Sequence, residues 1–183
     1  LCNYRQDSWE RMSDQISKQQ IHECFLDGIE PTVQDHRNTS SVPLEAELTP
    51  PLPPKIRVYA YEVTTPPGSG AEGDRLAHLI IPGQSSGERA SFDHSGGHVV
   101  RLVGYDPQIE VVILWDAVVH QNVKYGKRVR ATAETGYEAV GGEIGTQQRH
   151  LTTGTETVLT VRHDRLADAI ESRSEITTER LVG

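Results

Sequence analysis

Two strongly apolar segments separated by a short turn sequence constrain this chain more than any other feature. Residues 99–105 and 109–115 are rich in β-branched and aromatic side chains, and residues 106–108 between them, Asp-Pro-Gln, are typical of a turn. The unbroken apolar run 111–115 suits a strand covered on both faces, because a half-exposed strand would alternate apolar and polar residues. The sequence therefore predicts a hairpin in the middle of a sheet.

The segments before this hairpin predict a helix, a linker and two strands. Asp7 and Glu10 have capping-box spacing, which favours a helix over residues 8–24. Residues 28–54 are rich in Thr, Ser, Pro and Glu, and such a composition buries too little apolar surface to offset its ordering entropy. We therefore expect a linker there. Two strands are expected after it, over residues 56–63 and 76–81.

The segments after the hairpin predict a strand, a helix, a strand and a short helix. The two strands are expected over residues 127–133 and 155–162. Thr135 and Glu138 form a second capping box, and the helix that they predict carries an apolar stripe of Tyr137, Val140, Ile144 and Leu151. Asp164 is expected to cap the short helix that follows.

This order of elements predicts an α/β or α+β fold with a single mixed β-sheet flanked by helices. The expected organisation is an N-terminal helix in residues 1–27, a Pro-, Ser- and Thr-rich linker in 28–54, and a mixed-sheet domain in 55–183. With 183 residues, the chain is long enough for one domain with a full core.

The charge of the chain changes sign after Asp116. The formal net charge is -8, which argues against a surface that binds nucleic acid everywhere. No acidic residue follows Asp116 until Glu134, and the basic island between them contains His120, Lys124, Tyr125, Lys127, Arg128 and Arg130. Arginine and lysine bind phosphate, and aromatic rings stack on exposed bases, so a local DNA site is one interpretation. Protection of an edge strand by charge is the other.

The loop 84–97 is the second candidate region for binding. It contains Arg89, Asp93 and His94 among glycines and serines, and loops of this kind often carry binding sites. An ordinary connection between two strands is the alternative interpretation of this loop. In strand geometry Arg128 and Arg130 of the basic island point to the same face. The loop and the basic island could each supply one part of an interface.

Catalytic and metal-binding patterns are weaker. A nuclease of the PD-(D/E)XK class needs carboxylates that hold Mg²⁺ and a nearby lysine. Asp93 and Asp116 are the candidate acids, but the strand that would carry the acid-x-Lys pattern has Arg-Val-Arg at 128–130 instead. The histidines lack zinc-ligand spacing. We expect no catalytic residue, metal or cofactor, except Mg²⁺ if the nuclease alternative holds.

The cysteine content and hydropathy predict an intracellular protein. Cys2 and Cys24 are the two cysteines, and we expect free thiols rather than a disulfide. No apolar run approaches the roughly 20 residues that span a bilayer, so we expect no membrane contact and a cytoplasmic location. The acidic surplus and the scarcity of lysine resemble cytosolic proteins of salt-loving organisms.

Five short motifs stand out in residues 55–173, namely 81–84 (Ile-Pro-Gly-Gln), 87–93 (Gly-Glu-Arg-Ala-Ser-Phe-Asp), 103–105 (Val-Gly-Tyr), 112–117 (Val-Ile-Leu-Trp-Asp-Ala) and 125–127 (Tyr-Gly-Lys). In these motifs, residues 55–173 resemble a module found beside restriction endonucleases and methylases. The matching positions are Arg89, Asp93, Trp115, Asp116, Tyr125 and Lys127. The resemblance implies a DNA-recognition domain of a restriction or genome-defence system, with a methylated base or a phosphorothioate backbone as candidate targets.

Three functional hypotheses follow. The first is a DNA-binding domain, with a nuclease or methylase subunit or domain as a partner, whose interface contains Arg89, His94, Trp115, His120, Lys124, Tyr125, Lys127, Arg128 and Arg130. The second is a Mg²⁺-dependent restriction-type nuclease with a degenerate site at Asp93 and Asp116. The third is a non-enzymatic interaction module in which the Pro-rich segment 49–54 is a docking peptide.

Overall fold

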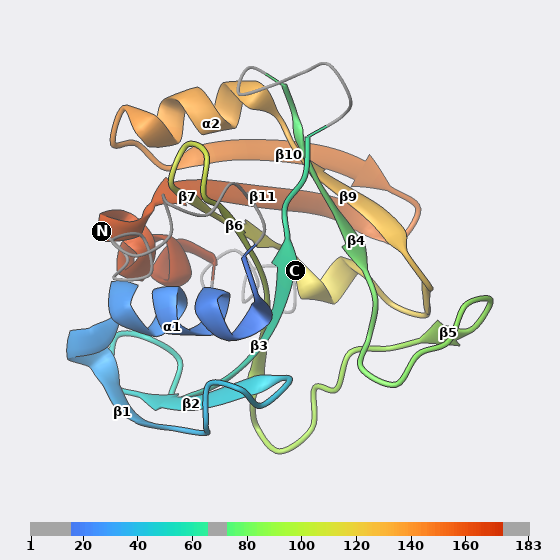
Figure 1. Cartoon of the computed structure of the whole chain (residues 1–183), viewed down its shortest axis with the longest axis horizontal. Coiled ribbons are helices and arrows are strands. Elements are labelled where there is room, and N and C mark those ends of the chain that lie inside the picture. Colours follow the sequence, from blue (N-terminus) through green and yellow to red (C-terminus); the bar gives the residue numbers. More distant parts are fainter. Residues whose placement is uncertain (1–15, 66–72, 174–183) are drawn as a thin grey trace.

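The computed structural model describes residues 16–65 and 73–173. Within them, seven strands form one mixed sheet in the order β1-β2-β3-β6-β7-β11-β10 (Figure 1). These strands are β1 (Val33–His36), β2 (Leu44–Leu48), β3 (Lys55–Glu62), β6 (Val99–Asp106), β7 (Val111–Trp115), β10 (Gly145–Leu151) and β11 (Gly154–Arg162). β3 and β6 pair in parallel, and the other neighbouring strands pair antiparallel.

Two short ribbons and several helices complete the described part of the chain. One ribbon pairs β4 (Arg75–Leu79) with β9 (Lys127–Ala131), and the other pairs β5 (Arg89–Ala90) with β8 (Val123–Lys124). The helices are α1 (Lys18–Gly28), α2 (Ala133–Val140) and a helix over residues 166–173. Three 3-10 turns lie at Glu30–Thr32, Ala117–Val119 and His163–Arg165. The predicted fold class, a mixed sheet flanked by helices, is confirmed.

The central hairpin lies where the apolar pattern predicts it. β6 and β7 pair antiparallel, and every residue of β7 is buried. In the turn between them, the backbone N–H of Gln108 donates to the Asp106 carboxylate at 2.8 Å. β6 is the middle strand of the seven, with β3 on one side and β7 on the other.

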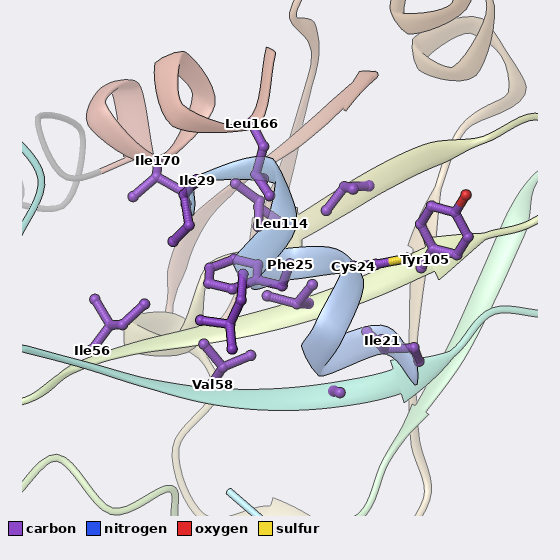
Figure 2. Packing of buried hydrophobic residues seen from close by; sticks show 14 of the residues in the cluster. Ile21, Cys24, Phe25, Ile29, Ile56, Val58, Tyr105, Leu114, Leu166 and Ile170 are labelled. Atoms are coloured by element: carbon purple, nitrogen blue, oxygen red, sulfur yellow. The ribbon is translucent and has the colours of Figure 1, made fainter. Parts of the chain in front are cut away.

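The sheet is buried on both faces by different elements, which explains the unbroken apolar run of β7. On one face, Phe25 of α1 and Leu166 of the last helix pack against Leu114 (Figure 2). On the other face, Trp115 packs in a cluster with Val129 of the β4–β9 ribbon. Alternate residues of β7 therefore contribute to two separate cores.

The first helix starts later than its predicted boundary. Ser17 is its N-cap and forms a capping box with Gln20, in which the Gln20 N–H donates to the serine hydroxyl at 3.2 Å. The predicted capping box of Asp7 and Glu10 lies outside the described residues. The prediction of free thiols is wrong for Cys24, which is disulfide-bonded.

The segment 28–54 is not the unpacked linker that its composition suggests. It contributes β1 and β2 to the sheet, and β2 pairs with β3 so that Leu44 lies opposite Val58. β2 buries alternate residues, which is the pattern of a strand with one face on the core. The Pro-rich segment 49–54 is the turn from β2 to β3, and the Leu48 N–H donates to the Pro54 carbonyl at 2.9 Å. Leu52 in this turn is buried, so the segment is not a free docking peptide.

The helix predicted from Thr135 onward is shorter than expected and differently capped. Thr132 is the N-cap of α2, and its side chain accepts the Thr135 N–H. The helix ends at Val140, because Gly142 has a φ of +93° that a helix cannot contain. Residues 145–151, expected to continue the apolar stripe, form strand β10.

The strands predicted over 127–133 and 155–162 are confirmed as β9 and β11. The short helix at the end of the described chain is also present, and its apolar residues Leu166, Ala169 and Ile170 are buried. Asp164 lies in the 3-10 turn before it and pairs with Arg162 at 2.9 Å instead of capping the helix.

A substitution at Gly104 tests the close packing of the central hairpin. A Cβ at this position would lie 2.6 Å from Val63 Cγ2 and 2.8 Å from Trp115 Cζ3. We expect Gly104→Ala to lower the free energy of unfolding by about 1 to 3 kcal/mol, the usual cost of overpacking. Urea denaturation measures this. Gly141→Ala is the control, because its Cβ meets no atom closer than 3.4 Å, and an equal loss in both variants would contradict the packing argument.

Candidate nucleic-acid interface

The outer face of the β4–β9 ribbon presents two arginines. Along β9, Val129 and Ala131 are buried against the sheet, whereas Arg128 and Arg130 are exposed, so the predicted common face of the two arginines is confirmed. His78 of β4 lies opposite Arg128 in the register and is also exposed. Sequence reasoning missed His78. His78 is a polar residue that interrupts an otherwise apolar strand segment, and this break in the pattern could have identified it as an exposed residue.

The predicted binding loop and the basic island meet in the second ribbon. Arg89 of β5 lies opposite Lys124 of β8 in the register, and Arg89 Nη1 donates to the Asn122 carbonyl at 3.0 Å. The side chain of Gln84 holds the two segments together, because its Nε2 donates to the carbonyls of Glu88 at 3.0 Å and Val123 at 2.8 Å. Figure 1 shows this ribbon extending away from the main sheet.

The β5–β8 ribbon is also connected to the β4–β9 ribbon. The Gly126 N–H donates to the Leu79 carbonyl at 2.8 Å, and the Tyr125 N–H donates to the Glu88 carbonyl at 3.1 Å. Arg89 and Lys124 are exposed, while Tyr125 and Lys127 are half-buried. Four fixed cations from separate segments therefore lie on connected ribbons, namely Arg89, Lys124, Arg128 and Arg130.

The other end of the loop is attached to the main sheet. Phe92 is buried and its ring meets the Tyr59 ring edge-on at 4.9 Å between centroids. Arg57 of β3 donates through Nη1 to the carbonyls of Asp93 at 2.5 Å and Ser95 at 3.1 Å. His94, between these attachment points, is exposed. The loop is thus fixed at both ends, with its polar side chains outward.

Glu45 of β2 supports this attachment. Its carboxylate pairs with Arg37 at 2.6 Å, with Arg57 at 3.4 Å and with His98 Nε2 at 2.8 Å. Burial alone would raise the pKa of Glu45, but the hydrogen bond from Arg37 and the charges of Arg57 and His98 outweigh it, so the pKa lies below its usual value. The ionised carboxylate therefore holds Arg57 in place beneath the loop.

Two residues predicted to contact DNA lie in the interior instead. Trp115 is fully buried, and its indole Nε1 donates to the Arg130 carbonyl at 3.2 Å. His120 is also buried, with Nε2 against the Glu156 carboxylate and Nδ1 3.1 Å from Lys127 Nζ. These side chains support the basic residues from beneath and are not exposed to a ligand at the surface. Sequence reasoning missed Glu156, because nothing in the β11 pattern indicates that its partner is a histidine 36 positions earlier.

The two candidate catalytic acids have different surroundings. Asp116 is buried, caps the 3-10 turn Ala117–Val119 and pairs with Arg173 of the last helix at 3.3 Å. Asp93 is exposed and lies 3.5 Å from Arg57 of β3. Within residues 16–65 and 73–173, no group of three or more His, Cys, Asp or Glu side chains could hold a metal ion.

A family model described as Methylase-associated X1 matches residues 54–170, which is more than half of the chain. The chain belongs to this family. No curated protein and no solved structure matches it significantly. The match is consistent with a restriction-modification context and contains both ribbons and the loop, whereas Glu45 lies outside it. No helix in the described part of this Methylase-associated X1 chain is long and apolar enough to cross a membrane.

Acidification tests the role of Glu45 in attaching the loop. Because its folded pKa is depressed, the ionised carboxylate stabilises the fold at neutral pH, and this contribution is lost as the pH falls below about 4.5. We expect Glu45→Gln to be less stable than the parent chain at neutral pH, and the difference to shrink at about pH 3. Urea denaturation at both pH values measures it. A difference that stays constant with pH would show that the charge of Glu45 is not involved.

Proposed function

We propose that this Methylase-associated X1 domain binds DNA within a restriction-modification system, with the two ribbons as its interface. The observation that carries the proposal is the exposed group of Arg89, Lys124, Arg128 and Arg130 in a chain whose net charge is -8. Arginine binds phosphate with two parallel hydrogen bonds, and cations on rigid strands keep their spacing along a backbone. The membership in a methylase-associated family supports DNA as the ligand.

The geometry supports two different roles within this interface, namely phosphate contact and discrimination between DNA substrates. Arg128 and Arg130 lie on the exposed face of β9, where they can contact phosphates without reading bases. Arg89 lies on the ribbon that extends from the sheet, and its guanidinium is oriented by the Asn122 carbonyl. We propose that the loop with Arg89 and His94 distinguishes modified from plain DNA, whether the modification is a methylated base or a phosphorothioate.

Replacing both ribbon arginines tests the phosphate contacts. We expect Arg128→Gln/Arg130→Gln to weaken binding to all duplexes about equally and to reduce the slope of log K against log salt by about 0.9 per lost phosphate contact. Fluorescence anisotropy with a labelled duplex over a salt series measures both quantities. The folded state should be little affected, because Arg130 is 44% exposed and its pair with Asp74 is a surface ion pair.

The matched control removes the same charge elsewhere. Arg162 and Arg165 are 45% and 37% exposed, and each forms a surface ion pair as Arg130 does. Arg162→Gln/Arg165→Gln should keep the parent salt slope. An unchanged affinity and salt slope in the ribbon variant would assign the arginines to protection of an edge strand and remove the proposal.

A single change in the loop tests discrimination. Arg89→Gln should bring the affinities for modified and plain duplexes closer together, since a good bidentate base contact contributes about 1 to 3 kcal/mol of discrimination. Competition titrations with plain, methylated and phosphorothioate duplexes of one sequence measure this. If the parent chain binds all three equally, the loop is not a sensor of these modifications.

A further inference from the structure

Helix α2 packs with its small residues inward and its large apolar residues outward. Thr135, Gly136 and Ala139 are buried, whereas Tyr137 is 60% exposed and Val140 is 49% exposed. A surface helix usually buries its large apolar side chains against the core. Within the described residues, Val42 is the other large apolar side chain that is exposed to this degree, and it lies on a different segment.

This orientation is enforced by close contacts beneath the helix. A Cβ at Gly145 of β10 would lie 2.4 Å from the Thr135 carbonyl oxygen, so helix and strand approach as closely as only glycine permits. A Cβ at Gly136 would lie 3.1 Å from the Ile109 side chain. On the same face, the Thr160 hydroxyl lies 3.4 Å from that of Thr135. The helix cannot rotate to bury Tyr137 without breaking these contacts.

A cavity adjoins the exposed face of α2. It has a volume of about 290 Å³ and is lined by Val140, Tyr105, Ile109, Glu110 and the turn at residues 162–164. Val140 therefore belongs both to the exposed helix face and to the cavity wall. A hollow lined by apolar and charged side chains, next to exposed apolar side chains, can receive an anchoring side chain from a partner protein.

Most of the charged side chains around this surface are acidic. Glu134 and Glu138 of α2 and Glu143 just after it surround Tyr137 and Val140 in the sequence, and Glu110 lines the cavity. Two arginines next to this surface are paired, Arg162 with Asp164 through two hydrogen bonds of 3.0 and 2.9 Å, and Arg165 with Asp168 at 3.1 Å. A partner that covers this surface would gain from lysine or arginine around an apolar anchor.

We propose that Tyr137, Val140 and the adjoining cavity form the docking surface for the methylase partner, through a segment of that partner with an apolar anchor flanked by basic residues. A second copy of this acidic chain would place like charges opposite each other, which disfavours self-association here. In Figure 1, α2 lies at the other end of the molecule from β5, so the part of the proposed DNA interface that contains Arg89 stays accessible when the partner is bound.

The test uses the full chain and the purified methylase of its own restriction-modification system. Tyr137→Gln/Val140→Gln keeps good helix formers in α2 and should weaken methylase binding at least about tenfold, as truncation of interface anchors does. Val42→Gln changes an exposed apolar residue elsewhere and should bind the methylase as the parent chain does. DNA affinity should be unchanged in both variants, which separates this inference from the proposed DNA binding.

Two further measurements test the role of the acidic residues and whether a second copy of the chain binds the α2 surface. Glu138→Gln/Glu143→Gln should slow association with the methylase several-fold at low salt, whereas Glu30→Gln/Glu47→Gln, with the same charge change on exposed residues elsewhere, should not. Sedimentation should show the parent chain free of self-association through α2. The inference is overturned if the methylase does not bind, if it binds the Tyr137/Val140 variant normally, or if this variant abolishes a dimer of the parent chain.

Discussion

The position of the Trp115 side chain determines how the second layer of this protein is placed on the sheet. Its ring packs so closely over Gly104 of β6 that a single methyl group there would collide with it, and its indole N–H donates to the Arg130 carbonyl of β9. One side chain thus joins the central hairpin to the β4–β9 ribbon through packing and a partly buried hydrogen bond. The outward direction of the Arg128 and Arg130 side chains follows, because the inward positions of β9 are occupied by Val129 and Ala131.

Polar interactions beneath the candidate interface hold in place the strands and the loop that carry its exposed side chains. His120 and Glu156, 36 positions apart in the sequence, are buried side by side, and Lys127 reaches the histidine from the ribbon. Arg57 and Glu45 attach the loop in a similar way from β3 and β2. A buried charge is tolerated only when it is paired and hydrogen-bonded, which makes these groups sensitive to any shift of the elements that carry them. The exposed cations are consequently presented by a rigid base.

The predicted features that the structure confirms share one property, namely a pattern that is local in sequence. The central hairpin, β9 and β11 were predictable because β-branched runs and turn residues act within a few positions. The segment 28–54 was not, since Leu44, Ala46 and Leu48 form a strand only when β3 is beside them to accept its hydrogen bonds. The segment is indeed poor in apolar residues. A few apolar residues at alternate positions are nevertheless enough to form a strand when the edge of a sheet is already present beside it.

By itself, the sequence determined that a two-sided central hairpin exists, that a mixed sheet surrounds it, and that an acidic chain carries one basic strand. Tertiary structure decided which of the basic and aromatic residues are exposed. Trp115 and His120 belong to the same short stretch as Lys124 and Arg128, yet they are buried while the cations are exposed. Tyr137 and Val140, which a helical stripe would bury, are exposed because glycines at 136 and 145 let α2 approach β10 on its small-residue side. The physical reason is that a side chain is buried only where the element packed against it leaves room for its volume. The residues that set this room lie far away along the chain.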